Sequence, residues 1–247
     1  LHTQAFDTKN TCEDKLIKLN HSFQQWKEQP MHDRQRWLIQ LASNITKKKS
    51  KIATLISTDM GKPVTEALKE VDKCIQCCQF YAQKIDSITE KLNEENGQRL
   101  PVGVILGIMP WNFPIWQLIR FIVPAIIVGN TCAIKPAHNT FRVAASLLEC
   151  SPKTNPIIDC IIPSDHDASK LIGHPLVAGV SFTGSVNVGR KIGQLAAEHF
   201  KPCVLELGGS DPYIIFENAD LEPAISTAVN ARFSNSGQTC ISAKRFL

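Results

Sequence analysis

Five short apolar runs alternate with helical stretches between residues 102 and 207, and this alternation restricts the possible folds more than any other feature of the sequence. The runs are 102–109, 131–135, 157–162, 177–182 and 203–207, and the helical stretches between them are 115–128, 141–148, 166–172 and 186–199. Strands that alternate with helices form right-handed βαβ units whose parallel sheet is covered on both faces. The sequence therefore predicts an α/β protein, and ligands of such sheets bind at the carboxyl ends of the strands.

The segments on either side of this alternation have different patterns. Residues 1–96 are mostly helical, and their polar end at 90–98 is expected to lie on the surface. After residue 207 the pattern starts again. A strand at 213–216, a helix at 221–232 and a polar loop lead to the start of a last strand, which we expect to lack a partner. We therefore divide the chain into a domain at 1–207 and the incomplete opening of a second domain at 208–247.

Composition excludes several classes of protein. The 247 residues carry a net charge of only +4, so a nucleic-acid-binding surface has little support. The longest apolar stretches, 102–116 and 121–134, are interrupted by proline and glycine and are too short to span a membrane. We expect neither nucleic acid nor a membrane as a partner.

The nine cysteines are scattered, which is typical of reduced thiols in a cytoplasmic protein. One cluster, Cys74, Cys77 and Cys78, admits a metal site or helix packing. A zinc site needs a second pair of ligands at suitable spacing, and none follows nearby. Because Cys78 shares a helical face with Val71, Ile75 and Ala82, we favour packing and expect no metal site.

Two residues are suited to acyl chemistry. Cys240 follows a polar, glycine-containing loop, where a thiol would be able to approach a substrate carbon. The alternative is a loop cysteine without a role. Glu206 lies at the end of an apolar strand, directly before two glycines, which suits a general base as well as a purely structural strand end.

Two turns add candidates for binding. Pro110 and Pro114 fix the backbone on either side of Asn112, whose amide is placed to donate to an oxyanion. At 182–189 a strand enters a glycine turn and then a helix, an arrangement that receives phosphate at a helix N-terminus. The same pattern also occurs as a simple tight connection.

Together these elements resemble the aldehyde dehydrogenase superfamily. The stretches that carry the resemblance are TDMGKPVTEALKEV, GIMPWNFP, AIKPA, SFTGSVNVG, VLELGGSDPYII and NSGQTC. The wording LELGGSDP with TCISAKRF is most similar to the succinate-semialdehyde dehydrogenase branch. The resemblance covers nearly the whole chain but only about the N-terminal half of the family's architecture. It implies a Rossmann-like cofactor domain at 1–207, and full-length members that are homo-oligomers.

The resemblance implies a role for each candidate. Cys240 would attack the aldehyde to give a thiohemiacetal, Asn112 would hold the oxyanion, and Glu206 would activate the water that hydrolyses the thioester. The cofactor would be NADP or NAD. Its binding residues would be Met109, Trp111, Lys135, His138, Gly184, Ser185, Gly189 and Leu207.

Arg120 is the only charged residue in the helical stretch 115–128. A lone helical arginine often reaches the surface along its apolar stem. The matching position in the succinate-semialdehyde branch resembles the arginine that takes the remote carboxylate of the substrate, and a guanidinium suits a carboxylate bidentately. We favour the substrate role.

The sequence departs from the family in three places. His138 stands where many NAD-preferring members have a glutamate, so a 2′-phosphate is allowed. The stretch 150–165 is shorter than usual at the adenine side. The segments that the family places after the nucleophile loop are absent from the 247 residues, so the alternative to an active dehydrogenase is a catalytically silent remnant that binds dinucleotide.

Overall fold

The computed structural model describes residues 6–88, 100–153 and 156–247. A five-stranded sheet forms its centre, in the order β3-β2-β1-β4-β5, and every pair of neighbouring strands is parallel. The strands are β1 Val104–Ile108, β2 Thr131–Lys135, β3 Ile158–Cys160, β4 Val177–Thr183 and β5 Cys203–Glu206. Each corresponds to one of the five predicted apolar runs, and only β4 extends past its run, by one residue, so the predicted α/β fold is confirmed.

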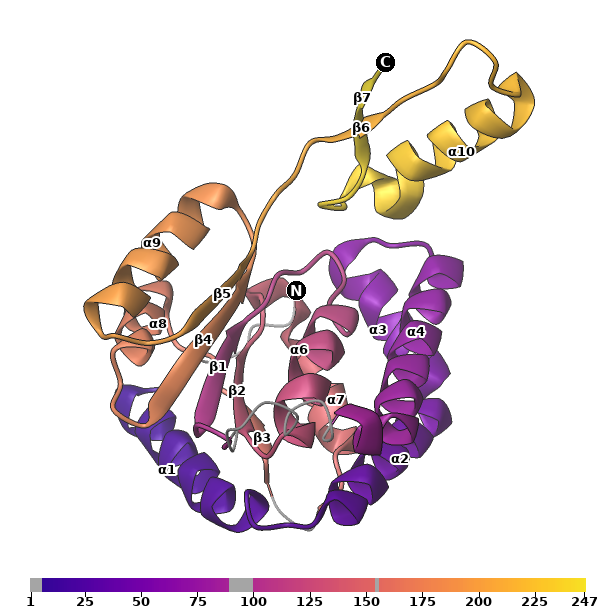
Figure 1. The fold of residues 1–247 in the computed structure, drawn as a ribbon. Helices are drawn as coiled ribbons and strands as arrows, with labels where there is room; N and C mark the ends of the chain where they lie inside the picture. Colours follow the sequence, from indigo (N-terminus) through magenta and orange to yellow (C-terminus); the bar gives the residue numbers. More distant parts are fainter. Residues whose placement is uncertain (1–5, 89–99, 154–155) are drawn as a thin grey trace.

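Helices cover both faces of this sheet (Figure 1). One face packs against α6 Trp116–Ile127 and α7 Phe141–Cys150, and α1 Lys9–Trp26, α8 Asp165–Ile172 and α9 Val186–Glu198 lie on the other. Three more helices extend the first layer: α2 Met31–Lys47, α3 Lys49–Met60 and α4 Val64–Gln83. The chain also contains two short 3₁₀ turns, η1 His138–Thr140 and η2 Ser234–Gly237. The predicted polar excursion at 90–98 lies outside the described residues.

The cysteine cluster belongs to helix α4. Cys74 and Cys78 are fully buried in the core that α4 shares with α2 and α6. Burial raises the pKa of the Cys78 thiol to about 12. These contacts confirm the helix-packing interpretation.

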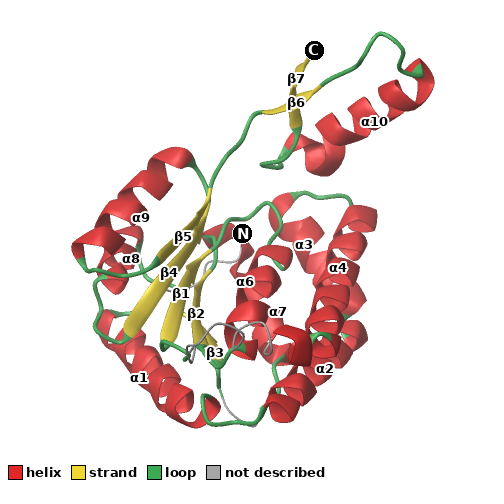
Figure 2. Cartoon of the chain, viewed as in Figure 1, coloured by secondary structure: helices red, strands yellow, loops and turns green. Residues whose placement is uncertain are grey.

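Residues after β5 form a small separate unit that projects from the main body (Figures 1 and 2). It contains β6 Asp211–Tyr213, helix α10 Leu221–Phe233 and β7 Ala243–Phe246. The prediction of a strand at 213–216 was wrong in its limits, because pairing with β7 in the register Asp211↔Ala243 to Tyr213↔Phe246 sets the limits of β6, not the apolar run. The expectation that the last strand lacks a partner was also wrong, since β6 and β7 form a parallel pair.

Helix α10 leaves its apolar side chains exposed. None of its residues is buried, and Ile225 and Val229 are 54% and 51% exposed. In the preceding segment Ile214 is 56% exposed. The apolar faces after residue 209 thus stay in contact with water.

Strand β1 and helix α6 approach so closely that only glycine fits at position 107. A Cβ built on Gly107 would lie 2.3 Å from Cε1 of Phe121. We predict that Gly107→Ala lowers the free energy of unfolding by about 1–3 kcal/mol through overpacking. Urea denaturation measures the change, with Gly208→Ala as the matched control because nothing lies within 4 Å of that position. Equal stability of the two variants would contradict the packing described here.

Candidate active site

The carboxyl ends of four strands meet at one edge of the sheet. The register pairs Ile108 with both Lys135 and Phe182, and Thr183 with Glu206. The turns that follow β1, β2, β4 and β5 therefore lie at one edge. They carry Met109, Trp111, Asn112, Lys135, His138, Gly184, Ser185, Glu206 and Leu207. The sequence placed its candidates in these turns, and the parallel register brings the turns together.

The turn after β2 carries Lys135 and His138. Lys135 is half-buried, and its carbonyl accepts from the Met109 N–H at 3.0 Å. The His138 ring lies edge-on to Phe6, with 5.0 Å between the ring centroids. Met109 is itself buried in the core, whereas Trp111 is 39% exposed.

The N-terminus of helix α9 follows the glycine turn. The Ser185 hydroxyl caps the helix by accepting from the Val188 N–H at 3.4 Å, and Gly184 N–H donates to the carbonyl of Glu206 at 3.0 Å. Gly189 lies against Leu207, and a Cβ on this glycine would come within 2.3 Å of that side chain. The glycine thus lets α9 pack tightly beside the end of β5.

These residues fit a dinucleotide phosphate. The first turn of α9 contains no acidic side chain, and Val186 and Val188 are each 46% exposed. The first N–H groups of a helix have no intrahelical partner and attract anions. Lys135, at the end of β2, adds a positive charge to this edge. His138 adds to the fit as well, because a carboxylate at its position would repel a 2′-phosphate.

Asn112 lies in the turn between β1 and α6 and contacts the nucleophile loop, residues 234–240. Its Nδ2 donates to the carbonyl of Gln238 at 2.7 Å. Its own carbonyl accepts from Asn235 Nδ2 at 2.8 Å and from Lys62 Nζ at 3.1 Å. The structure thus brings together two motifs that are more than 120 residues apart.

The nucleophile loop has a left-handed backbone. Asn235, Ser236 and Gly237 have φ of 53°, 56° and 74°. Left-handed conformation costs about 1–2 kcal/mol for a residue with a Cβ, so it persists only where contacts enforce it. Two contacts of Asn235 enforce this conformation. Its side chain donates to the carbonyl of Asn112, and its N–H donates to Glu66 Oε2 at 2.9 Å.

Cys240 follows this loop in a half-buried position. Its carbonyl accepts from Lys244 Nζ at 2.9 Å. In the described part of the chain, no hydrogen bond or ion pair joins Cys240 to Glu206. Cys77 and Cys203 are half-buried as well, whereas the other six cysteines are buried. Cys240 is therefore distinguished from the others by its loop.

Glu206 has a partner that the sequence did not indicate. Arg120 Nη2 lies 3.2 Å from Glu206 Oε1, and both side chains are partly exposed. The two residues line a hollow of about 620 Å³ over the sheet, between α6 and strands β4 and β5. The other lining residues are mostly apolar, among them Ile105, Phe121, Pro124 and Val204.

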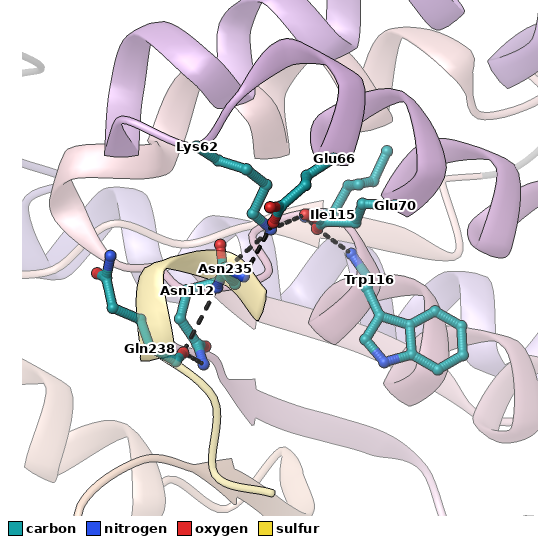
Figure 3. Close-up of polar contacts among 8 residues, drawn as sticks. All are labelled: Lys62, Glu66, Glu70, Asn112, Ile115, Trp116, Asn235 and Gln238. Carbon is teal, nitrogen blue, oxygen red and sulfur yellow. Dashed lines mark hydrogen bonds and ion pairs between the residues drawn. The ribbon is translucent and has the colours of Figure 1, made fainter. Parts of the chain in front are cut away.

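Three charged residues of the site were missed from the sequence: Lys62, Glu66 and Glu70. Figure 3 shows them converging on the Asn112 turn and the nucleophile loop. Lys62 and Glu70 are 3% and 5% exposed. Lys62, Glu66 and Glu70 follow one another at intervals of four residues, next to the buried Ala67 and Val71. This spacing was the signal that could have found them, because charges that repeat beside an apolar helix face need partners.

The sequence model of the aldehyde dehydrogenase family matches residues 4–247. The chain belongs to this family. It is 36% identical over 242 residues to the probable succinate-semialdehyde dehydrogenase (NADP(+)) of Synechocystis sp., covering 94% of this chain and 53% of the relative. It is 37% identical to the succinate semialdehyde dehydrogenase (NAD(P)+) of Escherichia coli, covering 91% of this chain and 51% of that relative.

Solved structures of aldehyde dehydrogenases share the fold. The succinic semialdehyde dehydrogenase of Streptococcus pyogenes in complex with NADP+ superimposes with a TM-score of 0.90 at 33% identity. The alignment covers 100% of this chain and 56% of that structure. The chain thus spans about half the length of the relatives it matches.

The described residues contain neither a metal-binding group of side chains nor a membrane-spanning helix. No three His, Cys, Asp or Glu side chains among them are grouped to hold a metal ion. None of the described helices has the length and apolar character needed to cross a membrane.

Differences in burial predict that the half-buried Cys240 is alkylated before the six buried cysteines. A buried thiol with a pKa of about 12, such as Cys78, holds about one thiolate in ten thousand at pH 8. With limiting iodoacetamide at that pH, we expect Cys240 to react at least about tenfold faster than any of the six buried cysteines. Peptide mass spectrometry after timed quenching measures the rate at each cysteine. Labelling of Cys78 or Cys132 as fast as that of Cys240 would contradict the prediction.

Proposed function

We propose that this protein catalyses the NADP- or NAD-dependent oxidation of an aldehyde to a carboxylic acid, with succinate semialdehyde as the substrate. The observation that carries the proposal is the hydrogen bond of 2.7 Å between Asn112 Nδ2 and the carbonyl of Gln238, two residues before Cys240. It joins the oxyanion donor to the nucleophile loop at the carboxyl edge of the sheet. The names of the Synechocystis and E. coli relatives support the choice of substrate.

The first step forms a carbon–sulfur bond. The Cys240 thiolate attacks the aldehyde carbon, and the electron pair of the carbonyl moves to oxygen to give a thiohemiacetal oxyanion. An amide nitrogen carries two N–H groups. One N–H of Asn112 is used by Gln238, and the second is available to this oxyanion together with the Cys240 N–H. Asn112 Oδ1 is buried without a partner among the described residues, so Nδ2 alone orients the amide.

A bound nicotinamide cofactor would supply the acceptor for the hydride that leaves the thiohemiacetal carbon. The resulting thioester is hydrolysed by water. Glu206 takes a proton from that water, whose oxygen attacks the thioester carbon, and the Cys240 thiolate leaves with the carbon–sulfur electron pair. Glu206 is 52% exposed at its side chain, so water reaches it freely.

The cofactor residues are proposed on the same edge. Ser185 and Gly184 at the start of α9 would hold the pyrophosphate, Gly189 and Leu207 support that helix, and Lys135 would bind the adenosine ribose. His138 would admit a 2′-phosphate, and Trp111 and the Met109 backbone would flank the nicotinamide. The NADP(+) relatives are in keeping with this assignment. Nine unpaired thiols support a cytoplasmic compartment.

If Glu206 activates the hydrolytic water, the Glu206→Gln variant should show a burst of NADPH formation. Glu206→Gln removes the base but leaves the nucleophile, so we expect one equivalent of NADPH to form rapidly and steady-state turnover to fall by about 10²–10⁴-fold. Stopped-flow absorbance of the natural gene product with succinate semialdehyde records both phases. Cys240→Ala is the matched control and should abolish the burst itself. An unchanged steady state in Glu206→Gln would remove this residue from the mechanism.

Arg120 is proposed to bind the remote carboxylate of the substrate, exchanging its contact with Glu206 for the substrate. Loss of a charge-assisted contact costs about 1.5–3 kcal/mol, which corresponds to about 10- to 150-fold in kcat/KM. We expect Arg120→Leu to lose this much with succinate semialdehyde and little with butanal, an uncharged aldehyde of the same chain length. Equal losses with both substrates would show that Arg120 serves Glu206 instead.

A second function is favoured by the exposure of α10. Exposed apolar side chains forgo about 1.5–3 kcal/mol each, so the unit at 208–247 gains little stability from packing. Residues 1–247 alone would then bind dinucleotide at the edge of the sheet without turnover. Fluorescence titration with NADPH, beside an assay of aldehyde oxidation on this chain, distinguishes the two. Binding with steady turnover would exclude the silent form.

A further inference from the structure

Lys62 and Glu70 form a buried ion pair at the start of helix α4. Lys62 Nζ donates to Glu70 Oε2 at 2.5 Å, and their side chains are only 1% and 2% exposed. The Lys62 ammonium also lies 3.9 Å from the centroid of the Phe113 ring. Buried charges are tolerated only when their remaining donors and acceptors are also satisfied. The other partners of this pair therefore show what it holds in place.

All of those partners belong to the turn that carries Asn112 or to the helix after it. Lys62 Nζ donates to the carbonyl of Asn112 at 3.1 Å. Glu70 Oε1 accepts from Ile115 N–H at 3.1 Å and from Trp116 N–H at 3.0 Å. Helix α6 has no side-chain cap of its own, so a carboxylate from α4 fills that place. The ion pair thus fixes the turn at Asn112 and at the point where it enters α6.

Glu66 extends the same helix face to the nucleophile loop. It lies four residues from each member of the pair, and its Oε2 accepts from the Asn235 N–H at 2.9 Å. Asn235 is 1% exposed, and its side chain donates to the carbonyl of Asn112, the atom that Lys62 also contacts. One helix face therefore contacts both halves of the site (Figure 3).

We propose that Lys62, Glu66 and Glu70 form a positioning cradle that sets the distance between the Asn112 amide and the Cys240 loop. The three residues act through Asn112 and Asn235 and are not themselves catalytic. The effect on turnover rests on the proposed function, whereas the effect on the loop does not. Removing the Glu66 carboxylate releases the loop from α4 and leaves Asn112 in its turn, because the Lys62–Glu70 contacts remain.

The test compares three variants on helix α4. Glu66→Ala removes the acceptor for Asn235, Glu66→Gln keeps an amide oxygen in its place, and Asp72→Ala is the control because Asp72 pairs with Lys49 away from the site. Hydrogen–deuterium exchange of peptides that cover 234–240 is measured on the 247-residue chain. We expect exchange at least about tenfold faster in Glu66→Ala, restored in Glu66→Gln and unchanged in Asp72→Ala.

The second readout is kinetic and uses the natural gene product. We expect Glu66→Ala to lower kcat at least about tenfold with little change in KM for the cofactor, and Glu66→Gln to restore most of the loss. If the wild-type protein oxidises no aldehyde, the proposed function fails while the exchange result still tests the cradle. Unchanged exchange in Glu66→Ala, or an equal increase in Asp72→Ala, would overturn the proposal.

Glu70→Gln tests the ion pair itself. The glutamine keeps an oxygen that can accept from the N–H groups at the start of α6, and it removes the negative charge that pairs with the Lys62 ammonium. We expect faster exchange in peptides that cover 112–116 together with a lower unfolding midpoint. Protection at 112–116 equal to that of the wild type would overturn this part of the cradle. A variant that does not fold would support the pair, because breaking a buried ion pair strands a charge.

Discussion

The buried ion pair between Lys62 and Glu70 connects the helical layer to the chemistry at the edge of the sheet. The sheet alone fixes where its strands end, but it does not fix the turn after β1. That turn is held because Lys62 contacts its carbonyl at Asn112 and Glu70 accepts from the first N–H groups of α6. The helices before the sheet thus supply the rigid support that an oxyanion donor needs.

The parallel register supplies the other half of the arrangement. Since β1, β2, β4 and β5 all run in one direction, their carboxyl ends place Lys135, Ser185 and Glu206 at one edge, although each comes from a different βα unit. The tight packing of Gly189 on Leu207 brings the N-terminus of α9 beside the end of β5. The proposed phosphate site and the proposed base therefore become neighbours through backbone geometry.

The sequence was informative where one periodicity or one motif determines the outcome. Alternating apolar runs predicted the sheet, and the helical face that Cys78 shares with Val71 and Ala82 predicted its burial. It was uninformative where partners are distant in the chain. The ion pair between Arg120 and Glu206, the pairing of β6 with β7, and the contact of Glu66 with Asn235 all join segments whose spacing carries no local signal. Such contacts depend on tertiary packing, which overrides local propensity.

The central claim is that Cys240, placed by its loop against Asn112, carries the substrate during turnover. Acid quenching of the natural gene product within its first turnover with succinate semialdehyde and NADP, followed by peptide mass spectrometry, tests it most directly. We expect a succinyl thioester on the peptide that contains Cys240, present only when both substrate and cofactor are supplied. Aldehyde oxidation with the acyl group on a different cysteine, or with no acyl group on any peptide, would contradict it.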